Sequence, residues 1–351
     1  MSVIAHQRPG VYSDYNTSGV IWSNGKGKAV GIVALNSAEA NVVHKITKAV
    51  DAETIFGVEG EMYSLCCMAL KNGASEVMAV SAGTSTSCDY EAAFSTLETQ
   101  NGIYTVVCDS TSPTVHNLLK TSILNCSKNQ KERLGIVSFG KYENIDSVKS
   151  WAQGLNCERM ILLSQIPLDE SLKELSGNLL AAALAGVISG NVDPSSSFNT
   201  KTLSGIKGIS PTLDEDDIDT YITNGITPLE CVLDEAEIIR LVTSKTTTDG
   251  VFDTTFKDIN TVLIIDEVIP GLRDMLKNNL LGGKNNVTTR SAIATQTVIK
   301  LQEYKDSGII VDYQQPNISV SDQDATVCIV EVSFTVSHGL NQIIISANIK
   351  V

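Results

Sequence analysis

Residues 29–35 read AVGIVAL, an uninterrupted apolar run that decides the fold. A strand that is buried on both faces needs such a run, whereas a strand with one solvent face alternates apolar and polar residues. Further apolar runs follow at Val77–Ser81, Ile103–Asp109, Leu134–Phe139 and Met160–Leu163. The chain therefore contains several strands of the kind found inside a sheet that is covered on both sides.

Segments with helical spacing separate these strands. Glu61–Asn72 ends at Gly73, a usual helix C-cap, and Pro113–Lys128 starts with proline in its first turn after Ser112. Leu172–Ser189 is a long alanine-rich helix. This alternation predicts an α/β fold with a central, mostly parallel sheet and helices on both faces.

The two ends of the chain differ from this central part. Residues 1–27 are rich in Gly, Ser and Asn and have too little apolar mass to fold alone, so we expect an extended N-terminal β arm. The last third contains two helical segments, followed by alternating strands at Ile309–Tyr313, Thr326–Val336 and Asn341–Val351. It predicts a C-terminal α+β domain that ends in a second β arm.

The predicted organisation follows from these changes in pattern. We expect an arm over 1–27, an α/β domain over 28–235, an α+β domain over 236–340 and an arm strand over 341–351. Residues 189–219, rich in Ser, Gly, Pro and Asp, predict an irregular surface loop within the α/β domain.

Composition excludes several classes of protein. With 40 acidic and 26 basic residues among 351, the formal charge is −14, which argues against a nucleic-acid partner bound through a basic face. No apolar run reaches the roughly 18–20 residues of a membrane span, so no membrane partner is expected. The first residues lack the features of a secretory signal, which indicates folding in the cytoplasm. The eight cysteines show no metal-ligand spacing, which fits a reducing compartment.

Candidate chemical sites are weak. Gly25–Lys28 precedes a strand rather than following one and lacks the phosphate-loop pattern. Asp214–Asp217 with Asp219 could hold a divalent cation, although a solvated helix start explains the same residues. We therefore expect no catalytic residue, no cofactor and no metal, and we interpret the chain as a non-enzyme. The unpaired end strands instead favour β-augmentation between copies of the chain.

The ordered set of motifs resembles the contractile phage tail sheath family. The set comprises Arg8–Tyr12, Ala29–Leu35 followed by Ile55–Gly57, Leu70–Val77, Ile259–Leu263, Thr288–Arg290 and the strands after Ile309. Within that family the chain is most similar to the small sheath subunits of clostridial and bacillar prophage tails and of R-type bacteriocins. The resemblance implies a subunit that polymerises around an inner tube and contracts to drive the tube through a target cell envelope.

The resemblance also implies which residues join neighbouring copies. The donated arm strands would include Val11, Tyr12, Val20, Ile21 and Trp22 at one end and Ile343, Ile344, Ile345 and Ile349 at the other. The acceptor would be a hairpin of Ile309–Tyr313 with Thr326–Val336, represented by Ile309, Val311, Ile329 and Val332.

The inner tube would be a second partner. The basic residues Arg273, Lys277, Lys284 and Arg290 gather in an otherwise acidic chain, and we expect them to contact an acidic tube surface through salt-sensitive pairs, although ordinary helix solvation explains them equally well. The resemblance adds baseplate and tail terminator proteins as partners. It implies assembly in the bacterial cytoplasm and release as part of a phage tail or bacteriocin particle.

Two other functions remain open from the residues alone. A doubly wound α/β enzyme that binds a nucleotide would use the parallel sheet, but no glycine-rich phosphate loop follows any predicted strand. A surface adhesin built from donated strands would need an export signal.

Overall fold

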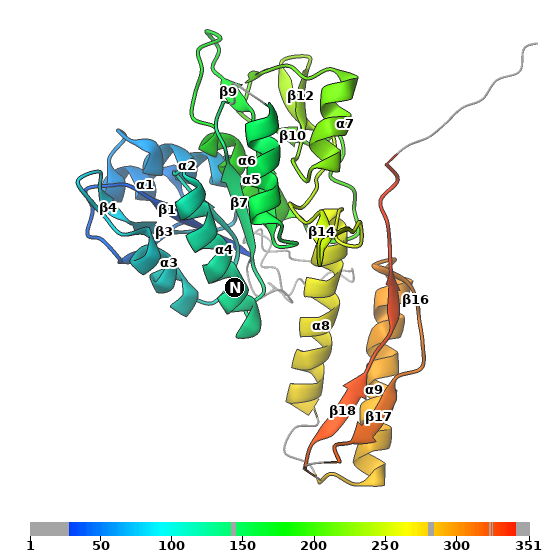
Figure 1. The fold of residues 1–351 in the computed structure, drawn as a ribbon. Helices are drawn as coiled ribbons and strands as arrows, with labels where there is room; N and C mark the ends of the chain where they lie inside the picture. The colour runs from blue at the N-terminus through cyan, green and yellow to red at the C-terminus, as the bar shows by residue number, and fades with distance from the viewer. Residues whose placement is uncertain (1–27, 142–144, 280–283, 323, 325, 342–351) are drawn as a thin grey trace, which may run out of the picture.

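The computed structural model describes residues 28–141, 145–279, 284–322, 324 and 326–341 (Figure 1). The predicted arm residues at 11–22 and 343–349 lie outside the described residues. The described part of the chain forms an α/β unit and a slender C-terminal unit of two helices and a β ribbon (Figure 1).

A six-stranded sheet is the centre of the α/β unit, with strand order β2-β3-β1-β6-β7-β8. Its strands are β1 (Ala29–Ala34), β2 (Val43–Ile46), β3 (Val77–Ser81), β6 (Ile103–Cys108), β7 (Leu134–Ser138) and β8 (Met160–Leu163). Strand β1 pairs in parallel with both β3 and β6, and only the edge strand β2 runs antiparallel to its neighbour. The predicted mostly parallel α/β sheet is confirmed.

Helices cover both faces of this sheet. One face carries α1 (Ala49–Phe56), α2 (Glu61–Lys71) and α6 (Asn178–Gly190), and the other carries α3 (Tyr90–Thr99), α4 (Pro113–Lys128) and α5 (Ile145–Leu155). Alternate residues of β1 enter two different cores: Val30 and Ile32 pack with α2 and α6, whereas Ala29 and Val33 pack with α3 and α4. This double burial is why AVGIVAL contains no polar residue.

Helices α2 and α6 approach each other closely because small residues face the contact. A Cβ atom on Gly186 would collide with the carbonyl oxygen of Ala69 and lie 3.0 Å from the Cβ of Asn72. Every alanine from Ala181 to Ala185 is fully buried. The alanine-rich composition of α6 therefore reflects a tightly packed core position.

The segment predicted as an irregular loop contains regular structure. It holds β10 (Thr202–Leu203), β11 (Gly208–Ser210) and the start of α7 (Glu215–Thr223). Strand β11 pairs with β9 (Ile166–Leu168), and β10 joins β12 (Leu229–Val232) and β13 (Glu235–Ile238) in a three-stranded sheet. The prediction was wrong here because strands of two or three residues depend on distant partners and carry no periodic signal.

Other parts of this region agree with or refine the expectations. Asp214 caps α7 by accepting a hydrogen bond from the Asp217 backbone N–H at 2.8 Å, so the acidic cluster starts a helix. The predicted boundary after residue 235 falls inside the β12–β13 hairpin. Two further short hairpins are β4 (Gly83–Thr84) with β5 (Ser87–Cys88), and β14 (Thr247–Thr248) with β15 (Val251–Phe252).

The C-terminal unit begins with α8 (Ile259–Asn279) and α9 (Val287–Asp306), a helical hairpin. The strands β16 (Ile310–Tyr313), β17 (Asn317–Val320), β18 (Cys328–Glu331) and β19 (Phe334–Val336) follow. Helix α8 belongs to both units, because Ile259, Val262 and Leu263 lie in the core beneath α6, whereas Val268 and Leu272 pack with Leu301 of α9.

Candidate assembly surface

The β ribbon of the C-terminal unit consists of two short antiparallel pairs in series. Strand β16 pairs with β19, and β17 pairs with β18. The predicted hairpin is thus correct for β16 with 334–336 but wrong for 328–331, whose partner is the unpredicted strand β17. Pro316 lies in the interruption between β16 and β17, where it cannot donate a ladder hydrogen bond because proline has no N–H. The alternation in Asn317–Val320 was the signal that could have revealed β17.

Two of the four predicted acceptor residues lie beside the ribbon strands rather than in them. Ile309 precedes β16, Val332 lies between β18 and β19, and both are partly buried against the core of the C-terminal unit. Val311 and Ile329 are exposed, at 57% and 41%. Val311 sits where the pairing register of β16 shifts, so its side chain does not follow the regular alternation.

The edges of this ribbon are open. Within the described residues each of its sheets has two strands, so no strand covers either outer edge. Edge strands present unpaired N–H and C=O groups, which is the surface that an added strand from another chain uses. The ribbon therefore has the chemistry of an acceptor for β-augmentation.

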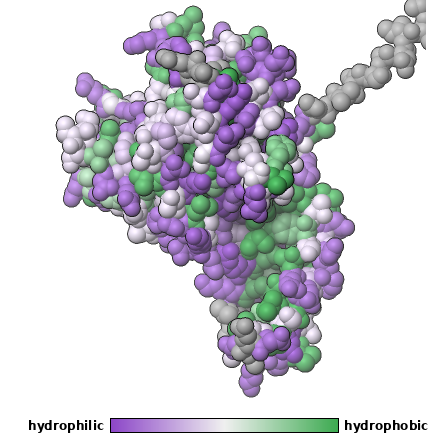
Figure 2. Space-filling view, viewed as in Figure 1, coloured by the Kyte–Doolittle hydropathy of each residue, from purple (hydrophilic) through white to green (hydrophobic). Residues whose placement is uncertain are grey.

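Apolar side chains accompany these edges. Figure 2 shows hydrophobic residues on the visible face of the C-terminal unit, between α8 and the ribbon. Among the described residues, the small core beneath them has six buried residues, and six further apolar residues around it are only partly buried. This unit thus retains apolar surface that a partner can cover.

A buried ion pair fixes α8 against the α/β unit. The Arg159 guanidinium donates two hydrogen bonds to the Asp266 carboxylate, at 2.6 and 2.8 Å, and the Asp266 side chain is 2% exposed. The Tyr104 hydroxyl donates a third hydrogen bond to Asp266 at 3.3 Å. Burial raises the pKa of Asp266, and the hydrogen bonds from Arg159 act in the opposite direction.

Two weaker pairs lie on the same side of α8. Lys28 Nζ is 3.9 Å from Glu267 and also lies over the Tyr104 ring, and Arg273 donates to Glu132 at 3.0 Å. Arg273 therefore joins the two units of its own chain, and its contact with a tube stays a prediction. Its pairing with Glu132 was not visible in the sequence because 141 residues separate the two.

The other three predicted tube-contact residues lie where α8 ends and α9 begins, at the far tip of the C-terminal unit in Figure 1. Lys277 and Lys284 are exposed, and Arg290 is half-buried with a hydrogen bond to Asn285 at 3.0 Å. The structure thus brings three of the four basic residues to one tip.

Sequence reasoning missed the residues that join the units. Asp266 stands in the apolar stretch Thr261–Leu272, TVLIIDEVIPGL, on a helix that reads as buried. A carboxylate in such a stretch needs a cationic partner, since a lone buried charge is strongly unfavourable. That signal predicts a partner but does not identify Arg159.

The carboxyl edge of the parallel sheet is where an α/β enzyme would bind its ligand. Between β1 and β6 this edge is filled by Asp109, whose carboxylate accepts hydrogen bonds from the Leu35 N–H and the Tyr90 hydroxyl, both at 2.7 Å. Asn178, at the start of α6, donates to the Asp109 carbonyl and to Glu61. Two carboxylates at the position of a phosphate would repel it, so this edge does not suit a nucleotide.

In the part of the chain that the structure describes, no group of three or more His, Cys, Asp or Glu side chains is placed to hold a metal ion. No helix in the described ranges has both the length and the apolar composition to cross a bilayer.

Comparison with known proteins gives a consistent result. The family model for the phage tail sheath C-terminal domain matches residues 252–350. No curated protein matches the chain. The sheath tail protein of Desulfitobacterium hafniense has a similar structure, with a TM-score of 0.70 and 11% identity over 93% of this chain and 100% of that one.

Two other solved structures are also similar. A sheath tail protein of Listeria innocua has a TM-score of 0.71 and 13% identity over 89% of this chain and 92% of that one. The helical sheath of the anti-feeding prophage, in its contracted state, has a TM-score of 0.73 and 12% identity over 98% of this chain and 99% of that one. The described fold is therefore that of tail sheath proteins, and residues 252–350 match the phage tail sheath C-terminal domain.

Proposed function

We propose that the chain is the structural subunit of a contractile tail sheath. Copies polymerise into a helical cylinder around an inner tube, and contraction drives the tube through a target cell envelope. The observation that carries the proposal is that the ribbon-bearing C-terminal unit lies in the region matched by the sheath family, while nearly the whole chain shares its fold with a solved helical sheath.

Donated strands would connect the copies. In this proposal the apolar residues Val11, Tyr12, Val20, Ile21 and Trp22, and at the other end Ile343, Ile344, Ile345 and Ile349, pair with ribbon edges of neighbouring copies. The open edges of β16–β19 and the exposed Val311 and Ile329 support this arrangement. A donated strand with about five backbone hydrogen bonds would contribute on the order of 5 kcal/mol.

Other partners follow from the same role. The tube would meet the basic tip formed by Lys277, Lys284 and Arg290, and baseplate and terminator proteins would bind the ends of the cylinder. The particle would assemble in the bacterial cytoplasm and be released as a phage tail or an R-type bacteriocin. The sequence resemblance favours clostridial particles of the diffocin type. The subunit itself would have no enzymatic activity.

Removing the last strand tests this role. A chain that lacks Asn341–Val351 should keep its circular dichroism spectrum and melting behaviour but fail to sediment as a polymer. The matched control replaces Ile343, Ile344 and Ile345 with threonine. Threonine keeps the backbone hydrogen bonds and the β propensity but removes apolar contacts, so this variant should weaken assembly only in part. Normal tubes from the truncated chain would contradict the donated-strand arrangement.

A further inference from the structure

The β12–β13 hairpin ends in an unusual apolar turn. Leu233 and Asp234 form the turn with φ angles of 50° and 61°, and the Leu233 side chain is 94% exposed. Turns of this type strongly favour asparagine and glycine, because left-handed backbone is unfavourable for other residues. Leucine at this position thus costs free energy twice, because its backbone is left-handed and its apolar side chain is exposed to water. A residue that is unfavourable for the isolated fold in this way often has a functional role.

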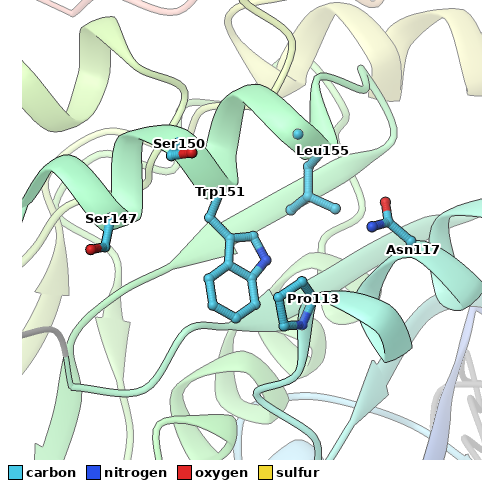
Figure 3. Close-up of a pocket in the computed structure, with 7 residues that line it drawn as sticks. Pro113, Asn117, Ser147, Ser150, Trp151 and Leu155 are labelled. Carbon is cyan, nitrogen blue, oxygen red and sulfur yellow. The ribbon is translucent and has the colours of Figure 1, made fainter.

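A surface pocket elsewhere on the α/β unit can receive such a side chain. It lies between α4 and α5, has a volume of about 250 Å³, and is lined by Pro113, Trp151, Gly154 and Leu155 with polar residues beside them (Figure 3). An apolar cavity of about 150 Å³ already holds a benzene molecule, so one leucine side chain fits.

The charges around the two features are complementary. Glu230, Asp234 and Glu235 are exposed around Leu233. At the pocket, Lys120 Nζ donates to the Leu155 carbonyl, and Lys149 lies next to Ser150 and pairs with Asp146 at 3.4 Å. Because Lys149 is already paired with Asp146, Lys120 beside the pocket is the positive charge that attracts the acidic tip and orients its approach.

The chain cannot fill its own pocket. The hairpin packs on the α2 and α6 side of the central sheet through Leu229, Ala236 and Ile238, whereas Trp151 packs on the opposite side. A contact between tip and pocket must therefore join two copies through different surfaces. Repeated head-to-tail contacts of this kind build open helices rather than closed rings.

We propose that Leu233 of one copy inserts into the α4–α5 pocket of the next copy, as a contact between sheath subunits that is additional to the donated strands. The inference rests on the proposed sheath function, because it needs an assembly in which copies repeat.

Two substitutions test the contact from its two sides. Leu233→Asn removes the apolar side chain and suits the turn better, so the chain should melt no lower while the concentration needed for assembly rises about tenfold. Gly154→Leu should have the same effect by filling the pocket, because a Cβ at Gly154 meets no atom within 4 Å.

Matched controls separate this contact from general loss of apolar surface. Leu172 also has a left-handed backbone, at φ 60°, and its side chain is 72% exposed. Leu172→Asn therefore makes the same substitution in the same backbone conformation at another turn. Gly154→Ala leaves most of the pocket open. Both control chains should assemble like the unchanged protein. Equal losses for Leu172→Asn and Leu233→Asn would overturn the proposal.

Cross-linking between two different chains gives the decisive result. One chain carries Leu233→Cys and the other Gly154→Cys, and both carry Cys88→Ser and Cys231→Ser because those thiols are exposed. Mixed assemblies should form a covalent dimer on oxidation, and each chain alone should not. Normal tubes without this dimer would overturn the contact and leave the sheath role intact. If the unchanged chain forms no tubes even with a tube protein, the sheath role fails and the contact fails with it.

Discussion

Asp266 forms a buried ion pair between the two units of the molecule. Its carboxylate is buried, and the bidentate hydrogen bonds from Arg159 compensate its charge. A buried pair of this kind adds little net stability over an apolar contact, but breaking it leaves an uncompensated charge in the interior. The pair therefore specifies how α8 sits on the sheet.

Asp266→Asn should lower the free energy of unfolding by about 3–5 kcal/mol, since Arg159 keeps its charge without a carboxylate. Urea denaturation followed by circular dichroism measures the loss. Asp312→Asn is the control, because Asp312 forms an exposed pair with Lys305 at 2.8 Å and its removal should cost less than about 1 kcal/mol. Similar small losses in both variants would show that the Arg159 pair does not fix α8.

His116 gives the α/β unit a dependence on pH. Burial lowers the pKa of His116 to about 4 from 6.5, while its hydrogen bond to the Ser110 carbonyl raises it. Between these values the unfolded chain binds more protons than the folded chain, so stability from this residue is complete above 6.5 and is lost as the pH falls towards 4.

The full contribution of His116 corresponds to about 3 kcal/mol. Replacing it, as in His116→Gln, should flatten the pH dependence of the unfolding free energy between pH 6.5 and 4, whatever the variant does to stability at pH 7. Denaturant titrations at several pH values measure this slope. An unchanged slope would show that His116 does not carry this part of the acid sensitivity.

At the scale of elements, the contact between α8 and α9 depends on a glycine. A Cβ on Gly271 would overlap the Tyr304 hydroxyl, which donates to the Glu267 carbonyl at 3.2 Å. Pro270 precedes it within a continuous helix. The pair Pro270–Gly271, which reads as a bend in the sequence, thus provides room for the tyrosine of the neighbouring helix.

Gly271→Ala should destabilise the protein by about 1–3 kcal/mol, although alanine is the better helix former, because Tyr304 must leave its position. Tyr304→Phe removes the overlapping hydroxyl, so the double variant should recover most of the loss. Thermal melts of the two single variants and the double variant measure the coupling. Simple addition of the two single effects would contradict this close contact.

The sequence predicts elements well where burial is periodic and poorly where pairing is distant. The core strands were predictable because a strand that is buried on both faces, such as the one with Val30 and Ile32, must be apolar at every position. The long helices were predictable because their apolar residues recur at helical spacing. Strands such as β10 and β11 were not, since two or three residues have no period. In the candidate site, the strand that carries Val311 and its pairing with 334–336 were predictable, but the partner of Arg273 was not.

At the scale of the whole molecule, charge is unevenly distributed. The chain has a formal charge of −14, yet Lys277, Lys284 and Arg290 occupy one tip. The double variant Lys277→Glu/Lys284→Glu should reduce co-assembly with an acidic tube protein and leave the melting temperature unchanged, because both side chains are exposed.

The salt dependence of co-assembly gives a second test of the contact between this tip and the tube. Co-assembly of the unchanged chain should weaken as ionic strength rises, and co-assembly of the double variant should not. Arg273→Glu is the contrasting change, since it opposes Glu132 and should lower stability instead. Undiminished co-assembly of Lys277→Glu/Lys284→Glu would place the tube contact elsewhere.

Copies of this chain should form a helical sheath, and electron microscopy of the purified protein, alone and with its tube protein, shows whether they do. We expect hollow, striated tubes with helical order, which enclose the tube protein when it is present. Particles that stay monomeric under both conditions, at concentrations where the chain is folded, would contradict it.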